Sequence, residues 1–129
     1  LGFLLRAQDR EAEAFRLSEL AEQSAAADDA DAQALWRALR APLLARRGDL
    51  SVAEGRAREA VNLAGRTEAP ILQADSRREL ARVLAIAGRV EDAVAVEREA
   101  LDLYRTKGDK VSALRSEAWI TQQTRSTVR

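Results

Sequence analysis

The feature that most constrains this chain is a helix–turn–helix hairpin that occurs twice, with its turn glycines, Gly48 and Gly88, forty positions apart. In the second copy, from Pro70 to Lys107, apolar residues recur at three- and four-residue spacing on both sides of Gly88. This spacing predicts two amphipathic helices. Gly88 ends the first of them because glycine adopts a positive φ without a Cβ clash. The pattern therefore favours stacked helical hairpins.

The composition predicts an all-α fold. Ala, Leu, Arg and Glu dominate and are good helix formers, whereas aromatic residues make up only 4% of the chain. A length of 129 residues suits one domain. We expect a turn at Gln8–Arg10 and about seven helices, near residues 2–7, 11–26, 30–47, 51–66, 70–87, 91–107 and 110–124.

Several residues predict how individual helices begin. Ser51 and Glu54 fit a capping box, in which each side chain bonds a free amide at the helix start. Asp109 is expected to be an N-cap, and Pro70 suits a first helical turn. Pro42 lies inside a predicted helix and is expected to kink it.

An acidic cluster precedes the helix that begins near residue 30, at Asp28, Asp29 and Asp31. We interpret it as helix capping. A calcium loop would need a Gly and a Glu at positions where this sequence has neither.

The predicted inward-facing apolar residues follow the helical spacing. They include Phe15, Leu17, Leu20, Leu35, Leu39, Leu43, Leu44, Val111 and Leu114. Ala60 and Ala100 are expected where two helices cross closely. Trp36 and Trp119 are interpreted as packing residues, with a role as partner-binding anchors as the alternative.

Charge and residue types exclude several classes of function. Lys and Arg number 21, as do Asp and Glu, so no concentrated basic face is expected for a nucleic acid. The chain has no Cys and no His, which excludes disulfides, imidazole catalysis and a typical zinc site. No apolar stretch is long enough to span a membrane. We expect a cytoplasmic, non-enzymatic protein without a cofactor or a bound metal.

The hairpins resemble the tetratricopeptide repeat (TPR). The segment Gly88–Ala93, followed by Ala100, is similar to the second half of that repeat, and Gly48, Ala53 and Ala60 repeat the spacing. The period of forty exceeds the usual 34, and the signature Trp and Pro positions are not filled. The resemblance implies a right-handed α-solenoid and a protein-interaction module that spans residues 1–129. Its units would lie near residues 1–27, 28–68, 70–108 and 109–126.

The amino-acid sequences of four short segments are similar to those of TPR arrays in large actinobacterial signalling proteins. These segments are 34–37, 44–49, 58–64 and 101–109. Such arrays often follow a class III adenylate/guanylate cyclase domain and an ATPase domain. The resemblance implies a regulatory C-terminal segment of such a protein as the alternative to a free-standing scaffold. The chain begins at Leu1 in what reads as mid-helix, so we expect it to be part of a longer protein.

A TPR-like fold implies a concave surface lined by the first helix of each hairpin. The predicted partner-binding residues on it are Asp75, Arg78, Arg82, Arg115 and Gln122. Arginine pairs well with carboxylates, so an acidic or C-terminal peptide segment, or another domain of the parent chain, is the expected partner. The alternative is a solvated face with internal ion pairs, such as Arg78 or Arg82 with Asp75 or Glu79.

The N-terminal edge predicts self-association. Phe3, Leu4 and Leu5 are apolar, and no polar capping helix precedes them. Together with Phe15 they would form an exposed apolar edge. We expect the isolated chain to associate through it as a symmetric homodimer.

Overall fold

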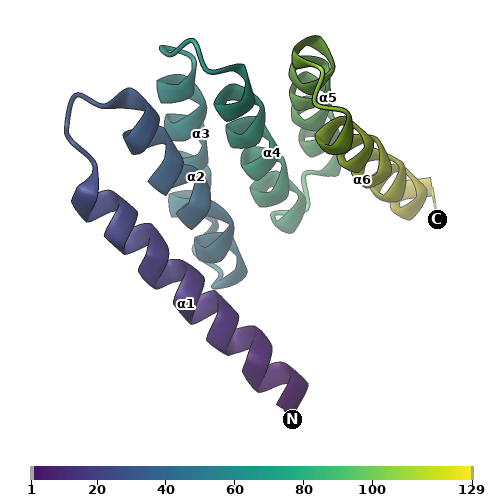
Figure 1. The fold of residues 1–129 in the computed structure, drawn as a ribbon. Coiled ribbons are helices and arrows are strands. Elements are labelled where there is room, and N and C mark those ends of the chain that lie inside the picture. The colour runs from purple at the N-terminus through teal and green to yellow at the C-terminus, as the bar shows by residue number, and fades with distance from the viewer. Residues whose placement is uncertain (1, 129) are drawn as a thin grey trace.

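The chain forms six α-helices joined by short turns, in a computed structural model that describes the backbone of residues 2–128 and the side chains of residues 8–125. The helices are α1 (Gly2–Ser24), α2 (Ala30–Arg46), α3 (Leu50–Ala64), α4 (Pro70–Ile86), α5 (Val90–Lys107) and α6 (Lys110–Val128). Figure 1 shows them as a row in chain order, with α1 and α6 at opposite ends. No strand occurs within residues 2–128, so the all-α prediction is confirmed there.

The helices repeat at the period predicted from the sequence. The helices α2, α4 and α6 begin at Ala30, Pro70 and Lys110, and α3 and α5 begin at Leu50 and Val90, so each equivalent pair is forty residues apart. The most extensive contacts are α2 with α3 and α4 with α5, which form two antiparallel hairpins. The hairpins join because α2 and α3 both contact α4. The helix α1 packs on α2 and α6 packs on α5.

The turns also repeat. Gly48, Gly88 and Gly108 have φ angles of 93°, 82° and 83°, which favour glycine because it has no Cβ. After each glycine, the next amide donates a hydrogen bond to a carbonyl five residues back, at 3.0, 2.9 and 2.9 Å. These bonds pair carbonyls that the helix end would otherwise leave free.

The repeat includes a side-chain ion pair between the helices of each hairpin. Arg37 Nε lies 3.7 Å from Glu59 Oε2 in the first hairpin, and Arg77 Nε lies 3.1 Å from Glu99 Oε1 in the second. In both cases Nη1 of the arginine donates to the backbone carbonyl four residues earlier, at 3.0 and 3.1 Å. The equivalence of the two hairpins therefore extends to side-chain contacts.

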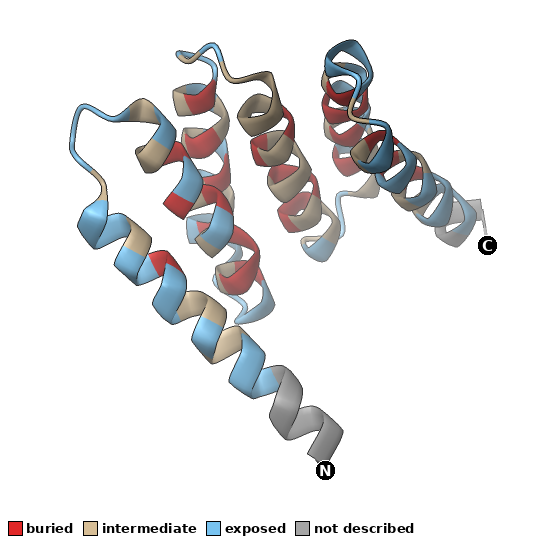
Figure 2. Cartoon of the chain, in the orientation of Figure 1, coloured by how far each residue is buried: buried red, intermediate tan, exposed pale blue. Residues whose placement is uncertain are grey.

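Small residues form much of the core. One cluster joins the hairpins and contains Ala41, Ala45, Ala53, Ala57, Leu80, Ala81, Val83, Leu84 and Ala93. A second joins α4, α5 and α6 and contains Ala74, Ala100, Leu101, Tyr104, Ala113 and Ile120. Ala60 and Ala100 are fully buried, as predicted for close crossings. Figure 2 shows that buried residues concentrate in α2 to α5, while α1 and α6 are mostly exposed.

The predicted turn at Gln8–Arg10 is wrong, because α1 continues through it. Those three residues include neither Gly nor Pro, and Gln and Arg are good helix formers, so nothing local ends the helix. This continuity reduces the predicted seven helices to six over residues 2–128.

The helix-start predictions have mixed outcomes. Asp29 accepts a hydrogen bond from Ala32 N at 3.1 Å, and Asp109 caps α6 in the same way through Ser112 N. The capping box at Ser51 is wrong, because α3 begins one residue earlier and has no side-chain cap.

The two proline predictions can also be compared with the structure. Pro70 occupies the first turn of α4, as predicted. The helix α2 continues through Pro42 without a break, and the kink expected there stays a prediction.

Six of the predicted inward-facing residues are exposed instead. They are Leu17, Leu20, Leu35, Leu39, Val111 and Leu114. The periodicity identified the apolar stripes correctly, but not which stripes have a neighbouring helix to cover them.

Candidate binding surface

The predicted partner-binding residues lie on equivalent faces of α4 and α6, and α2 has a corresponding face. Because these helices are related by forty residues, positions 35, 75 and 115 correspond, as do 39, 79 and 119, and 42, 82 and 122. We call this surface the first-helix face. It consists of Leu35 and Leu39 on α2, Asp75, Arg78, Glu79 and Arg82 on α4, and Arg115, Trp119 and Gln122 on α6.

Arg82 links three helices through a buried carboxylate. Glu97 of α5 is fully buried. Its Oε1 accepts a hydrogen bond from Arg82 Nη1 at 3.0 Å, and its Oε2 accepts one from Ser116 Oγ of α6 at 2.6 Å. The guanidinium carbon of Arg82 also lies 4.3 Å from the centre of the Trp119 ring, a cation–π distance. Arg82 is therefore already engaged within the chain, although its side chain stays partly exposed.

Asp75 is also engaged, by Tyr104 of α5. The Tyr104 hydroxyl donates to Asp75 Oδ1, and the tyrosine is fully buried. Burial, followed by this hydrogen bond to a carboxylate, raises the pKa of Tyr104 well above its ordinary value. The phenol therefore stays a neutral donor, which suits a structural contact.

Arg78 and Glu79 form another polar contact on the α4 part of the first-helix face, with Nη2 of the arginine 3.4 Å from Oε1 of the glutamate. Burial raises the pKa of Glu79, against the lowering effects of Arg78 and Arg82. The internal-ion-pair alternative thus correctly describes this pair. The other two named residues have partners that the sequence analysis missed, Glu97 for Arg82 and Tyr104 for Asp75.

The α6 part of the predicted site is more open. Arg115 and Gln122 are both exposed. The structure therefore separates the predicted site into a half-buried, internally bonded group on α4 and exposed residues on α6.

The charged group on α4 is a departure from the repeat. At the positions where the second hairpin has Asp75, Arg78, Glu79, Arg82, Glu97 and Tyr104, the first has Leu35, Ala38, Leu39, Pro42, Ala57 and Ala64. A comparison of the two copies for reversals of polarity would have identified Glu97 and Tyr104 from the sequence.

The α2 part of the first-helix face is apolar. Leu35 and Leu39 are 47% and 45% exposed, one helical turn apart. The face therefore changes from exposed leucines on α2 to charged groups on the adjoining α4.

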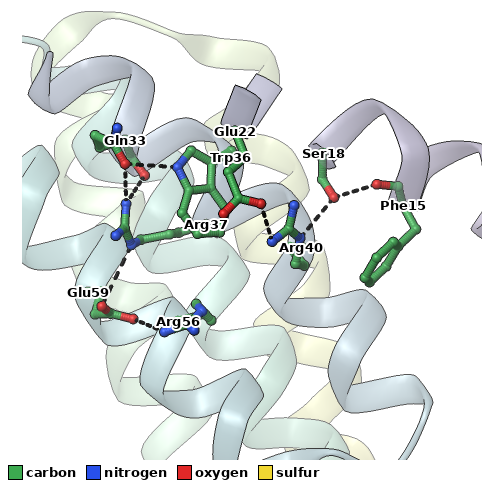
Figure 3. A network of polar contacts seen from close by, with 9 residues as sticks. All are labelled: Phe15, Ser18, Glu22, Gln33, Trp36, Arg37, Arg40, Arg56 and Glu59. Atoms are coloured by element: carbon green, nitrogen blue, oxygen red, sulfur yellow. Dashed lines mark hydrogen bonds and ion pairs between the residues drawn. The ribbon is translucent and has the colours of Figure 1, made fainter. Parts of the chain in front are cut away.

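Trp36 lies on another side of α2, in the polar network of Figure 3. It is almost completely buried, and its indole nitrogen donates to Gln33 Oε1 at 2.9 Å. The guanidinium carbons of Arg37 and Arg40 lie 4.3 and 4.6 Å from the centre of its ring. This arrangement confirms the interpretation of Trp36 as a packing residue.

The same network attaches α1 to α2. Arg40 Nε donates to Ser18 Oγ at 3.1 Å, and Nη1 of Arg40 lies 2.8 Å from Glu22 Oε1 (Figure 3). Phe15 is partly covered by the guanidinium groups of Arg40 and Arg47, at 5.3 and 4.1 Å from its ring centre. The other residues of the predicted self-association edge, Phe3, Leu4 and Leu5, lie outside the described side chains.

Comparison with protein-family models, curated proteins and solved structures finds no match for this chain. Among the side chains of residues 8–125, no three acidic groups gather in a way that could hold a metal ion. None of the described helices has the length and apolarity needed to cross a membrane.

Proposed function

We propose that the chain is a TPR-like, right-handed α-solenoid that binds a protein or peptide, or another domain of its parent chain, through the first-helix face. The observation that carries the proposal is the change along this face from exposed Leu35 and Leu39 to charged groups on α4 and α6. An exposed apolar patch beside charged groups is typical of protein-interaction surfaces. The side-chain ion pair repeated in both hairpins supports the helical-repeat architecture.

The chemistry of the face favours a particular kind of segment. Its partner would place an apolar side chain against Leu35 and Leu39, and a carboxylate toward Arg115. Arginine is suited to carboxylates because its planar donors bind two oxygens at once. Acidic and C-terminal peptides with an apolar residue have both groups. The balance of 21 basic and 21 acidic residues favours such a partner over a nucleic acid.

A non-catalytic role without a cofactor belongs to the same proposal. The buried ionisable groups are engaged in joining helices, since Glu97 accepts two hydrogen bonds and Tyr104 donates to Asp75. A general acid must reach a bound substrate to donate a proton and a general base must reach it to accept one, whereas these groups are occupied by contacts within the chain.

A peptide-display selection with the folded chain tests the proposal. We expect selected peptides to be acidic and to contain an apolar residue, and the double substitution Leu35→Asp, Leu39→Asp to abolish their binding. The matched control is Leu50→Asp, Val52→Asp, which changes exposed apolar residues on α3 and should leave binding intact. Binding that survives the first pair of substitutions, or is lost equally with the second, would place the site elsewhere.

The charge component should be tested at Arg115 alone. Arg82→Glu would place a second carboxylate beside the buried Glu97, so lost binding could result from unfolding. Arg115 is exposed, so Arg115→Glu should weaken peptide binding without changing the helical circular-dichroism signal.

A second candidate function rests on the sequence resemblance to actinobacterial signalling proteins. In it, the chain is a regulatory segment that follows a cyclase or ATPase domain in a cytoplasmic protein. The residues before Leu1 in the parent protein test this proposal, because catalytic motifs there would support it and further repeats alone would not.

A further inference from the structure

The helix α1 exposes apolar residues at positions that the repeat buries elsewhere. Leu17 and Leu20 are 57% and 58% exposed. Forty residues later, Ala57 and Ala60 are fully buried in the first hairpin, where α3 packs on α2. The helix α1 therefore presents the face that a second helix uses to contact the first helix of its own hairpin.

The helix α6 presents the opposite half of such a contact. Val111 and Leu114 are 61% and 64% exposed. Leu114 corresponds to Ala34 on α2 and Ala74 on α4, both fully buried in the hairpins. The helix α6 thus has the exposed face of a first helix that has no second helix packed on it among residues 2–128.

We propose that α6 of one copy of the chain pairs with α1 of a second copy, forming between two molecules the hairpin that α2–α3 and α4–α5 form within one. A second copy is the occupant because the chain has both halves of the contact, at opposite ends of the row of helices (Figure 1). In this pairing Leu114 meets Leu20 of the next copy. Their equivalents, Ala74 and Ala100, belong to one core cluster.

The charges beside these apolar residues determine how well the two faces match. Arg125 would lie near Glu13, because the equivalent residues in the first hairpin, Ala45 and Ala53, belong to one core cluster. These are opposite charges, which favours the pairing.

A second position is mismatched. The repeated ion pair Arg77–Glu99 would become Glu117 opposite Glu19, two like charges, with Arg105 of the same chain already paired with Glu117. The proposed contact therefore has one favourable and one unfavourable charge pair, and each gives a test.

The pairing is heterologous, since α1 and α6 are different surfaces. Repeated head-to-tail, it produces chains of molecules rather than a closed dimer. It differs from a symmetric contact through the N-terminal edge, and it does not depend on the proposed binding function because it leaves the first-helix face open.

Two complementary variants test the geometry by sedimentation across a concentration series. One blocks α1 with Leu17→Glu, Leu20→Glu, and the other blocks α6 with Val111→Glu, Leu114→Glu. Circular dichroism checks that both remain folded, which we expect because all four residues are exposed. The wild-type chain should form progressively larger species, and each variant alone should be monomeric. An equimolar mixture of the two should give a heterodimer, because each supplies the face that the other retains.

Three outcomes would overturn the proposal. They are a wild-type chain that stays monomeric at every concentration, an α6-blocked variant that still dimerises alone, and a mixture that shows no heterodimer. The first would leave these faces for another segment or protein, and the second would indicate a symmetric contact through α1.

Two charge substitutions of equal size provide the sharper control. Glu19→Arg should tighten wild-type association about two- to fivefold, because it replaces a repulsion from Glu117 with an ion pair that Glu117 shares with Arg105. Glu13→Arg changes the net charge identically but should weaken association by a similar factor, because it opposes Arg125. Equal effects of the two substitutions would contradict the proposed register.

Discussion

At the scale of single residues, Glu97 is a buried position where the second hairpin departs from the first. The first hairpin has Ala57 there, and both are fully buried. A buried carboxylate is tolerated only when it is paired and hydrogen-bonded, and Arg82 and Ser116 supply those bonds. Glu97 therefore stabilises the junction of α4, α5 and α6 only together with its partners.

Removal of the carboxylate alone should destabilise the fold. We expect Glu97→Ala to lower the free energy of unfolding by about 2–3 kcal/mol, below the usual range for a fully buried pair because Arg82 is partly exposed. Urea denaturation measures the loss. The double variant Glu97→Ala, Arg82→Leu should recover part of it, since it leaves no unpaired charge. A single variant as stable as the wild type would show that the pair contributes little.

The raised pKa of Glu79 predicts that the stability of the fold depends on pH. Burial raises its pKa in the folded state, while the unfolded value is about 4.3. The folded chain therefore binds the proton more tightly, and its stability falls as pH rises through the window between the two pKa values. Glu79→Gln removes this effect. The variant should be at least as stable as the wild type at pH 7, with a difference that vanishes below about pH 4. Urea midpoints across this range measure it, and a variant clearly less stable at pH 7 would show that the pairing with Arg78 outweighs burial.

At the scale of helical elements, the alanines determine how closely the helices approach. Ala100 is fully buried and belongs to the cluster of α4, α5 and α6, whereas Ala95 lies on the exposed side of α5. Ala100→Leu should cost about 1–3 kcal/mol of unfolding free energy, because a larger side chain forces the helices apart. Ala95→Leu adds the same atoms without overpacking and should be nearly neutral. Equal denaturation midpoints for the two variants would show that the crossing has room.

The helix starts offer a comparison between a cap that forms and one that does not. Asp29 accepts the Ala32 amide, so Asp29→Ala should cost about 1 kcal/mol. Ser51 lies within α3, and α3 has no side-chain cap, so Ser51→Ala should change stability little. Thermal unfolding of both variants decides between the predicted capping box and the observed helix start. A larger loss for Ser51→Ala would favour the capping box.

Most of the helical elements could be predicted from the sequence, because their signals are local. Gly48 and Gly88 end helices through their own backbone freedom, and Asp109 caps α6 with its own side chain. The predictions that failed concern side chains that bond other residues, some distant in sequence, in place of the expected local partner. Glu54 fitted a local capping box, but its oxygens bond Arg58 and, across the two hairpins, Arg89.

The candidate site was predictable only in part, because its side chains bond partners that are distant in the sequence. The position of Asp75, Arg78 and Arg82 on one face of α4 follows from helical spacing. Their actual partners on α5 and α6 depend on how three helices pack, which spacing alone does not specify.

At the scale of the whole molecule, the six described helices differ in whether apolar packing or polar contacts attach them to their neighbours. The two core clusters draw their buried residues from α2 to α6, and none of the described residues of α1 contributes to either. The contact of α1 with α2 relies on polar groups, including the ion pair of Arg40 with Glu22. Partly exposed polar contacts of this kind stabilise less than buried apolar surface.

The unequal packing predicts an order of local opening that hydrogen exchange can measure. Amides of α4 and α5 should exchange slowest, since both helices contribute to both clusters, and amides of α1 should exchange fastest among the described helices. If copies pair head to tail, raising the protein concentration should slow exchange in α1 and α6 selectively and leave α4 and α5 unchanged. In the variant Leu17→Glu, Leu20→Glu this concentration dependence should disappear, while the order of opening within one molecule remains. Exchange in α1 as slow as in α5 at low concentration would show that its polar contact with α2 is as strong as the apolar core.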